Sequence, residues 1–520
     1  MTDPGFTQDA GPGTPSIDAA RPGPEPDYAE PVDPWADGEA TAFAPGGADS
    51  HPVPLPDTWP DERGERPVPA YRKKWFWLVA AATAIVLGAG ATLAVVFWPG
   101  YRALDYHALG EPRRVAPAVP FSGHFITATV RDDRAYLASV SDDGVLGIVA
   151  ADTQSGTRLW AKTAPGSAED WERLVALPDA LVALSAADDD QRRLVLLDPG
   201  TGDLLWQRTV GEDDGLLFAD DTVVLVDRNQ HRLVGLETRG GGKVRWELKD
   251  PAAPSGSDDT AVYPAGTPDD LGGPATAAGL PIAPVLDGDE HIVQIGADRS
   301  ARVIDAATGK VLSLPRQSVA DPDDQVLAYD GRLIVAESDD ARRIVAYDLA
   351  KLGEPRVLYT APDTNTRFTH LTPCDADGVC FVQTTNSDAH TARVVAVNAA
   401  EGGRRWERPL ADTGNLVPVG DSLLAAQDTS PAQVSLLGAD GTVRWTREGA
   451  AARLDGGNML RFAKPLSTSP DDVSVAGEHL GDDGVELGPL SGVRSATCAW
   501  NTTVLACAAD KDFVLRSFAG

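Results

Sequence analysis

A short pattern of residues recurs along the chain after residue 110, and it constrains the fold more than any other feature. A run of aliphatic residues ends in Asp or Asn, a Gly follows four positions later, and a Trp follows four positions after the Gly. Three copies keep this spacing: Asp152, Gly156 and Trp160; Asp198, Gly202 and Trp206; and Asn398, Gly402 and Trp406. Looser copies keep part of it: Glu237 with Trp246, Asp305 with Gly309, Asp348 with Gly353, and Gly441 with Trp445. The chain is therefore built from a repeated unit.

Each part of this unit has a physical role in a β-hairpin. The aliphatic run favours a buried strand. Asp or Asn at its end can accept hydrogen bonds from the backbone amides that follow, and Gly supplies the positive φ that reverses the chain. A Trp at the same place in each unit is expected to pack between neighbouring sheets. From Trp160 to Trp206 and from Trp206 to Trp246 the chain advances 46 and 40 residues, the length of a four-stranded propeller blade.

The unit resembles the pyrroloquinoline-quinone (PQQ)-like propeller repeat, which occurs in quinoprotein alcohol dehydrogenases and in the bacterial lipoprotein of outer-membrane-protein assembly. The resemblance covers about residues 120–450. WD-repeat propellers are the nearest alternative, but none of the repeat tryptophans is followed by Asp. The resemblance implies an all-β fold, a β-propeller of about eight blades, with seven as the alternative. The composition, rich in Ala, Gly, Asp and Pro, is typical of high-GC, actinobacterial-like genomes.

Two stretches bear on how the ring is completed. A ring must close, so the last strands are expected to share a blade with residues 112–130. Residues 250–285, rich in Pro, Gly, Ser and Asp, are interpreted as an insertion between the third and fourth units. We interpret this insertion as a spacer, and a functional loop at the rim is the alternative.

An uncharged segment precedes the repeats. It runs from Trp75 to Trp98, a span of 24 residues, and at about 1.5 Å per residue a helix of this length is roughly 36 Å long, enough to cross a bilayer core of about 30 Å. The cluster Arg72–Lys74 before the segment places the N-terminus in the cytoplasm and residues 103–520 outside. Small residues recur at every fourth position (Ala80, Ala84, Gly88 and Thr92), a spacing that would allow a helix-mediated dimer.

Residues 1–70 are predicted to be disordered. They contain fifteen prolines, and acidic residues outnumber basic ones by fourteen to three, so too little apolar surface is available to offset the entropy of ordering them. The whole chain has a net charge of −32, which argues against nucleic acid as a partner.

The four cysteines are predicted to form two disulfides. Cys374 and Cys380 flank an Asp-Gly turn, and Cys498 and Cys507 flank Asn501, so each pair falls on facing strands of one hairpin. All four follow the predicted membrane span and would lie in an oxidising compartment. Four reduced, buried cysteines are the alternative.

No catalytic, cofactor-binding or metal-ligating residue is predicted. The dehydrogenases of the resembling family carry adjacent cysteines beside a quinone stacked on the propeller axis, and this chain has no adjacent cysteines. The acidic turns at residues 375–378 and 287–291 lack the ligand spacing of a calcium loop, and the histidines lack zinc spacing. We therefore expect a non-catalytic module that binds a protein or a cell-envelope ligand at the outer face of the cytoplasmic membrane. The alternatives are a sensor that signals through the tail and, third, a PQQ-dependent dehydrogenase.

Overall fold

The computed structural model describes residues 101–520 except 122–124, 220, 253–259, 277–284, 287–290, 338–341 and 376. The predicted disordered tail and the predicted membrane span with its small-residue stripe lie outside these residues. Within the described part, no helix is both long enough and apolar enough to span a bilayer.

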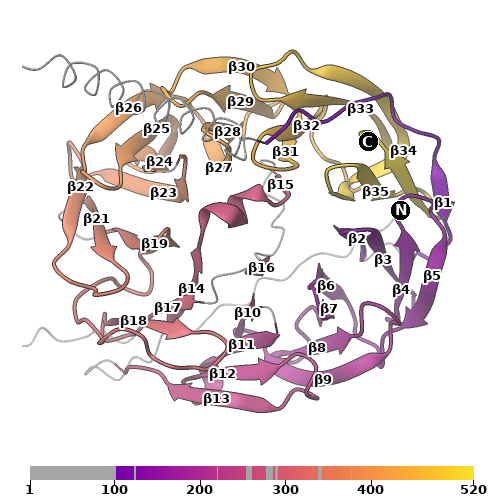
Figure 1. Ribbon diagram of the computed structural model, residues 1–520, viewed down its shortest axis with the longest axis horizontal. Coiled ribbons are helices and arrows are strands. Elements are labelled where there is room, and N and C mark those ends of the chain that lie inside the picture. The colour runs from indigo at the N-terminus through magenta and orange to yellow at the C-terminus, as the bar shows by residue number, and fades with distance from the viewer. Residues whose placement is uncertain are drawn as a thin grey trace, which may run out of the picture. The chain divides into compact units, whose positions relative to one another are not determined.

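The strands of the described residues form seven sheets, two of which each join two blades, so that nine blades of antiparallel strands follow one another around a ring (Figure 1). Blade 1 comprises β2 to β5 (Ile126–Arg131, Arg134–Val140, Leu146–Asp152 and Arg158–Thr163). Blade 2 comprises β6 to β9 (Trp171–Ala176, Leu181–Ser185, Gln191–Leu197 and Leu204–Gly211). Blade 3 comprises β10 to β13 (Gly215–Ala219, Thr222–Asp227, Arg232–Glu237 and Val244–Lys249), with the 3-10 helix η1 (Arg228–Gln230) in one of its turns.

Blade 4 is irregular and is continuous with blade 5. It holds β14 (Ala261–Gly266), β17 (His291–Ile295) and β18 (Ala301–Asp305), and residues 311–316 bridge to β18 in place of a fourth strand. The end of β14 pairs in parallel with β19, the first strand of blade 5. Blade 5 comprises β19 to β22 (Gln325–Tyr329, Arg332–Ala336, Arg343–Asp348 and Arg356–Thr360).

The remaining blades complete the circuit. Blade 6 comprises β23 to β26 (Thr366–Pro373, Gly378–Thr385, Asp388–Asn398 and Arg404–Pro409), and blade 7 comprises β27 to β30 (Thr413–Val419, Ser422–Gln427, Gln433–Leu437 and Val443–Glu448). Blade 8 comprises β31 to β33 (Ala450–Arg453, Asn458–Phe462 and Asp471–His479) and the first part of β34 (Val485–Trp500). Blade 9 takes the second part of β34, then β35 (Val504–Ala508), β36 (Phe513–Ser517) and β1 (Arg113–Val115).

The all-β architecture is as expected, but the number of blades is not. The sequence predicts eight or seven, and the described residues form nine. The reason lies after residue 450, where two blades carry no Asp–Gly–Trp signature and share one long strand. Residues of β34 up to Val493 pair with β33, and residues from Arg494 onward pair with β35. Counting signatures therefore misses a blade.

The expected ring closure is confirmed. β1 pairs antiparallel with β36, with Arg113 opposite Leu515 and Val115 opposite Phe513. Only the first part of residues 112–130 takes part, because β2 opens the next blade. The first strand, β1, and the last strand, β36, therefore both belong to blade 9. The backbone hydrogen bonds between them close the ring.

Buried aliphatic residues fill the space between each pair of neighbouring blades. Between blades 1 and 2, for example, Ile148 and Leu181 are fully buried in one cluster together with Trp160. Because each blade presents one face to each neighbour, the hydrophobic core is divided among the seams rather than gathered at a single centre.

The repeated tryptophans join consecutive blades. Each indole Nε1 donates to a backbone oxygen in the turn of the next blade, at 2.7–3.2 Å: Trp160 to Pro199, Trp206 to Thr238, Trp246 to Ala306 and Trp406 to Ala439. The Gly of that turn lies directly against the ring. A Cβ added at Gly202 would stand 2.6 Å from the indole of Trp160, and at Gly441 2.5 Å from that of Trp406. Gly is needed there both for its positive φ and for this close approach.

The Asp or Asn of the signature shapes the same turn. Asp198 Oδ1 accepts hydrogen bonds from the amides of Gly200 and Thr201 at 2.9 and 3.0 Å, and Asp305 and Asn398 accept equivalent bonds. Hydrogen bonds from Ser155 hold the pKa of Asp152 below its usual value. The turn that receives a Trp is thus preformed by local contacts within its own blade.

Candidate functional site

The other five seams depart from the docking pattern described above, and four of them show what stands in place of the docked Trp or of its receiving turn. Between blades 9 and 1, Arg113 replaces the Trp: its Nη1 donates to Thr153 O at 3.0 Å, and its stem packs on Gly156. Between blades 4 and 5, Arg316 Nη1 donates to Leu352 O at 3.2 Å. Between blades 5 and 6, no indole docks, and the backbone oxygen of Leu358 instead accepts a hydrogen bond from Gly403 N in the turn of blade 6. The fourth of these seams, between blades 7 and 8, keeps its Trp, but the indole donates to a side chain instead of a turn carbonyl.

At the seam between blades 7 and 8, a carboxylate takes the place of the backbone oxygen that accepts the indole at other seams. Trp445 Nε1 donates to Glu478 Oε1 at 2.7 Å, and Arg461 Nε lies 2.7 Å from the other oxygen, Oε2. The Glu478 side chain is only 6% exposed. The guanidinium of Arg461 also lies over the indole of Trp445, 5.6 Å from its centroid. Both carboxylate oxygens are thus occupied, and the buried charge is paired.

A small cavity of about 170 Å³ opens beside this cluster. Its lining combines Trp445, Arg461 and Phe462 with small residues of blades 7 and 8 and with the charged residues Arg447, Glu448 and Glu486. The polar groups nearest to the indole are already paired with one another, so we interpret this cavity as part of the seam.

The described part of the predicted insertion crosses the interior of the ring. This axial segment, residues 260–276, contains β14, the 3-10 helix η2 (Pro268–Gly272) and β15 (Ala275–Thr276). At one end Ala265 and Gly266 pair with the inner strand of blade 5, and at the other end Ala275 and Thr276 pair with the inner strand of blade 8, across the ring (Figure 1). Beyond it, β16 (Val285–Leu286) pairs with the inner strand of blade 3. The segment thus runs between inner strands, whereas the sequence interpretation offered a spacer or a rim loop.

A buried arginine fastens the far end of the axial segment. Arg453, on the inner strand of blade 8, donates from Nε to Gly273 O at 2.6 Å and from Nη1 to Pro418 O in blade 7 at 2.9 Å. Burial lowers the pKa of Arg453 to about 10, against the opposing charges of Tyr101 and Asp455. The guanidinium therefore remains charged at neutral pH. Its hydrogen bonds join blade 8 to the axial segment and to blade 7.

A second buried network fastens the near end. The fully buried Gln294 donates from Nε2 to Asp250 Oδ1 at 2.6 Å and to Thr260 Oγ1 at 2.9 Å, and its Oε1 accepts from Arg302 Nε at 2.6 Å. Burial raises the pKa of Asp250, and the hydrogen bond from Gln294 opposes this shift. Asp250 precedes residues 253–259 and Thr260 follows them directly, so these polar groups join the two flanks of that stretch.

Comparison with known proteins agrees with this architecture. A family model described as outer membrane protein assembly factor BamB, of PQQ type, matches residues 114–258, which hold three signatures. Residues 114–258 of the ring therefore match PQQ-like repeats. No curated protein sequence matches the chain.

Three solved structures illustrate how distant the structural likenesses are. BamB from Moraxella catarrhalis is 16% identical, with a TM-score of 0.40 over 80% of this chain and 100% of that one. A eukaryotic initiation factor is 14% identical, with a TM-score of 0.46 over 71% and 87%. A europium-containing methanol dehydrogenase is 11% identical, with a TM-score of 0.38 over 66% and 84%. Likenesses this distant say nothing about a shared activity.

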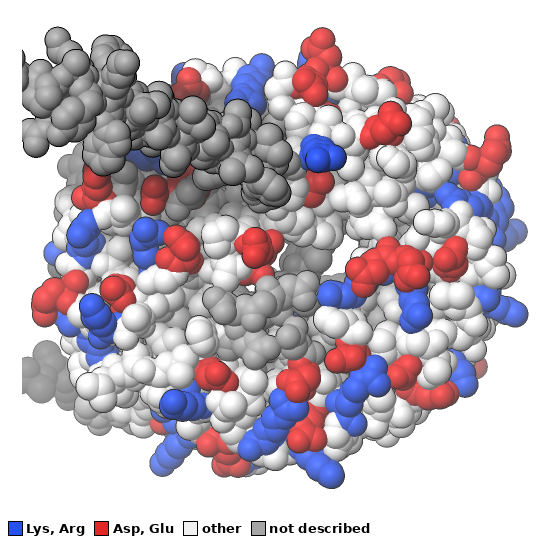
Figure 2. Space-filling model, in the orientation of Figure 1, with Lys and Arg blue, Asp and Glu red and all other residues white. Residues whose placement is uncertain are grey.

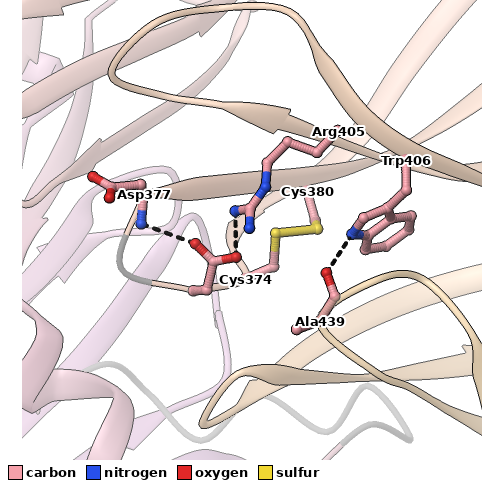
Figure 3. The surroundings of a disulfide bond; sticks show 7 residues. Cys374, Asp377, Cys380, Arg405, Trp406 and Ala439 are labelled. Atoms are coloured by element: carbon pink, nitrogen blue, oxygen red, sulfur yellow. Dashed lines mark hydrogen bonds and ion pairs between the residues drawn. A yellow bond between two sulfur atoms is a disulfide. The ribbon is translucent and has the colours of Figure 1, made fainter.

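Two disulfides staple hairpins of the propeller, with the pairing that the sequence predicts. Cys374 bonds to Cys380 at the start of blade 6, and Cys498 bonds to Cys507 between β34 and β35 of blade 9. Asp375, in the same turn, pairs with Arg405. Figure 3 shows the first disulfide near Arg405, with Trp406 docked on Ala439 of the next blade. Both disulfides are buried within hydrophobic clusters of the seams.

The predicted repeat residues are distributed around the propeller and are not gathered at one site. Residues 101–520, as far as the structure describes them, contain no cluster of three or more His, Cys, Asp or Glu side chains fit to hold a metal. The acidic turn at 287–291 lies almost wholly outside the described residues. No sequence pattern points to Arg453, Arg461 or Glu478, because each contacts a partner from another part of the chain.

Proposed function

We propose that this protein is a non-catalytic scaffold, anchored in the cytoplasmic membrane by residues 75–98, whose propeller binds a protein or cell-envelope ligand on the outer side. The observation that carries the proposal is the axial segment. In the quinoprotein dehydrogenases that the repeat resembles, the cofactor stacks on the propeller axis. In this chain the axial segment crosses the interior of the ring there, with its backbone hydrogen-bonded to blades 5 and 8. The residues of the axis therefore do not fit PQQ.

Two further features support binding as the function. The matching family model is described as an assembly factor, which is a role in bringing proteins together. On the face of the propeller shown in Figure 2, basic and acidic side chains are interspersed around the ring. A surface of mixed charge favours specific contacts over long-range attraction of one kind of ion.

The proposal predicts that the purified full chain binds no PQQ. Titration with PQQ, with and without Ca²⁺, is expected to leave the quinone absorbance unchanged and to reduce no dye. Stoichiometric uptake with dye reduction would replace the scaffold proposal by an enzymatic one.

The proposal also predicts a binding partner: cross-linking of intact membranes is expected to yield one discrete adduct of the chain. The adduct should be lost in Trp206→Ala, which loosens a seam, and kept in Leu204→Ala, which changes an exposed side chain of the same strand. Absence of any discrete adduct would contradict the proposal.

The proposed outer location predicts the state of the cysteines in cells. Non-reducing peptide mapping of protein alkylated during lysis is expected to return one peptide pair joined through Cys374 and Cys380 and one joined through Cys498 and Cys507, since disulfides persist in oxidising compartments. A parallel sample reduced before alkylation serves as the control. Free thiols at these positions would contradict the outer location, and a peptide joining the two regions would contradict the pairing.

A further inference from the structure

One cavity of the described residues lies at a seam that has lost its Trp. It has a volume of about 550 Å³ and opens between blades 5 and 6. At this seam the backbone of Leu358 replaces the docked indole: Gly403 N donates to Leu358 O at 2.8 Å. The cavity is lined by Tyr359, Thr360 and Pro362 on the side of blade 5, and by Gln383, Arg393, Arg404 and Glu407 on the side of blade 6.

The lining of this cavity carries more positive than negative charge. The carboxylate of Glu407 is shared between Arg393 Nη1 on one oxygen and Arg404 Nη1 on the other. Two guanidiniums thus share one carboxylate, which leaves one positive charge in a chain whose net charge is −32. Arg393 and Arg404 are 39% and 55% exposed, so both can reach a ligand. A guanidinium carries several donors in a planar fork, and Glu407 occupies only part of each fork.

Neutral groups complete the lining. Tyr359 donates its hydroxyl to Gln383 Oε1 at 2.8 Å, an arrangement that leaves the amide NH₂ of Gln383 as a further donor. Burial, and next to it the charge of Glu407, raises the pKa of Tyr359, against the opposing influence of Arg404 and Arg393. The tyrosine therefore stays a neutral hydroxyl at physiological pH. Its ring and Pro362 offer apolar surface beside the charged groups.

We propose that this cavity, called here the Arg393–Arg404 cavity, binds the carboxylate side chain of an acidic peptide segment from a protein partner. One carboxylate cancels the single excess charge, and it fits the planar guanidinium forks, whereas a phosphate dianion would leave a net negative charge. The volume exceeds that of a carboxylate, and the remaining lining of Tyr, Thr, Pro and Gln suits a peptide backbone. The inference deepens the proposed binding function by naming the ligand chemistry. A small peptide can test it whether or not the propeller has a stable partner.

The test is a titration of the full chain in detergent with the peptide acetyl-Gly-Glu-Gly-amide at low salt. Millimolar binding of the Glu peptide is expected, with the Gln counterpart at least about tenfold weaker because it lacks the charge. Arg393→Gln and Arg404→Gln are each expected to weaken binding about tenfold. Glu407→Gln is expected to strengthen it severalfold, since it removes the carboxylate that competes for both guanidiniums.

A matched variant and alternative anions make the test decisive. Arg232→Gln, which removes a partly exposed arginine paired with Asp227 and Glu247 in blade 3, should leave peptide affinity unchanged. Thermal unfolding of every variant checks that the propeller remains folded. Equal affinity for the Glu and Gln peptides, or unchanged or weaker binding in Glu407→Gln, would overturn the proposal. Tighter binding of inorganic phosphate or of glucuronate than of the peptide would overturn the assignment to an acidic peptide. PQQ binding has no bearing on these outcomes, so this inference and the scaffold proposal fail separately.

Discussion

Trp206→Ala is expected to lower the free energy of unfolding by about 3–5 kcal/mol, the range for removing a large buried aromatic side chain. Trp206 is 7% exposed, packs in the cluster between blades 2 and 3, and donates to Thr238 O at 2.7 Å. Its removal leaves a cavity against Gly242, which cannot fill the space, and leaves a buried carbonyl without its donor. Urea unfolding of the full chain in detergent, followed by far-UV circular dichroism, measures the loss.

The neighbouring Leu204 provides the control for this prediction. Leu204 lies two residues earlier on the same strand and is 46% exposed, so Leu204→Ala is expected to change the free energy of unfolding by less than about 0.5 kcal/mol. A loss below about 1 kcal/mol in Trp206→Ala would mean that the indole does not hold the seam. The assignment of the repeated Trp as the lock between blades would then be wrong.

Arg461→Met is expected to destabilise the propeller by about 2–4 kcal/mol, somewhat less than the full cost of breaking a buried ion pair because Arg461 is 24% exposed. The substitution keeps an aliphatic stem of similar length and removes the charge. It leaves the carboxylate of Glu478, 6% exposed, with only the neutral donor of Trp445. The same urea unfolding experiment measures the effect.

A second substitution separates lost packing from an unpaired charge. Glu478→Gln in the Arg461→Met background is expected to restore more than half of the lost stability, because the amide oxygen can still accept the hydrogen bond from Trp445 and carries no charge. Glu478→Gln alone is expected to cost less than Arg461→Met alone. If the double variant is no more stable than Arg461→Met, the loss comes from the arginine stem and its stacking on Trp445.

These two seams illustrate how far the sequence pattern reaches. The signature around Trp206 predicts both the turn and the docked ring, because the whole pattern recurs with fixed spacing. Trp445 follows a looser copy of the signature, and its partner Glu478 stands 33 positions later on a blade without one. The spacing of residue types within one blade is visible in the sequence, while the substitute partner on the next blade is not.

The number of blades and the path of the insertion show the same limit. The strands after residue 450 are readable as strands, yet nothing in them indicates that β34 serves two blades. Residues 250–285 read as an insertion from their composition, but composition carries no information about the inner strands of blades 5 and 8 that pair with β14 and β15. The Arg393–Arg404 cavity was likewise not predicted, because its lining comes from two blades.

The sequence by itself determined the features that arise between residues close along the chain. These are the strands, the Asp and Gly turns, and the hairpins in which Cys374 faces Cys380 and Cys498 faces Cys507. The period of the repeat predicted that these hairpins form the blades of a propeller, because a blade can bury its two faces only by packing against other blades. Only the tertiary structure decided which oxygen accepts each indole, how many blades close the ring, and which segment crosses it. Those contacts join residues brought together by closure of the ring, and the spacing of residues within one blade does not specify them.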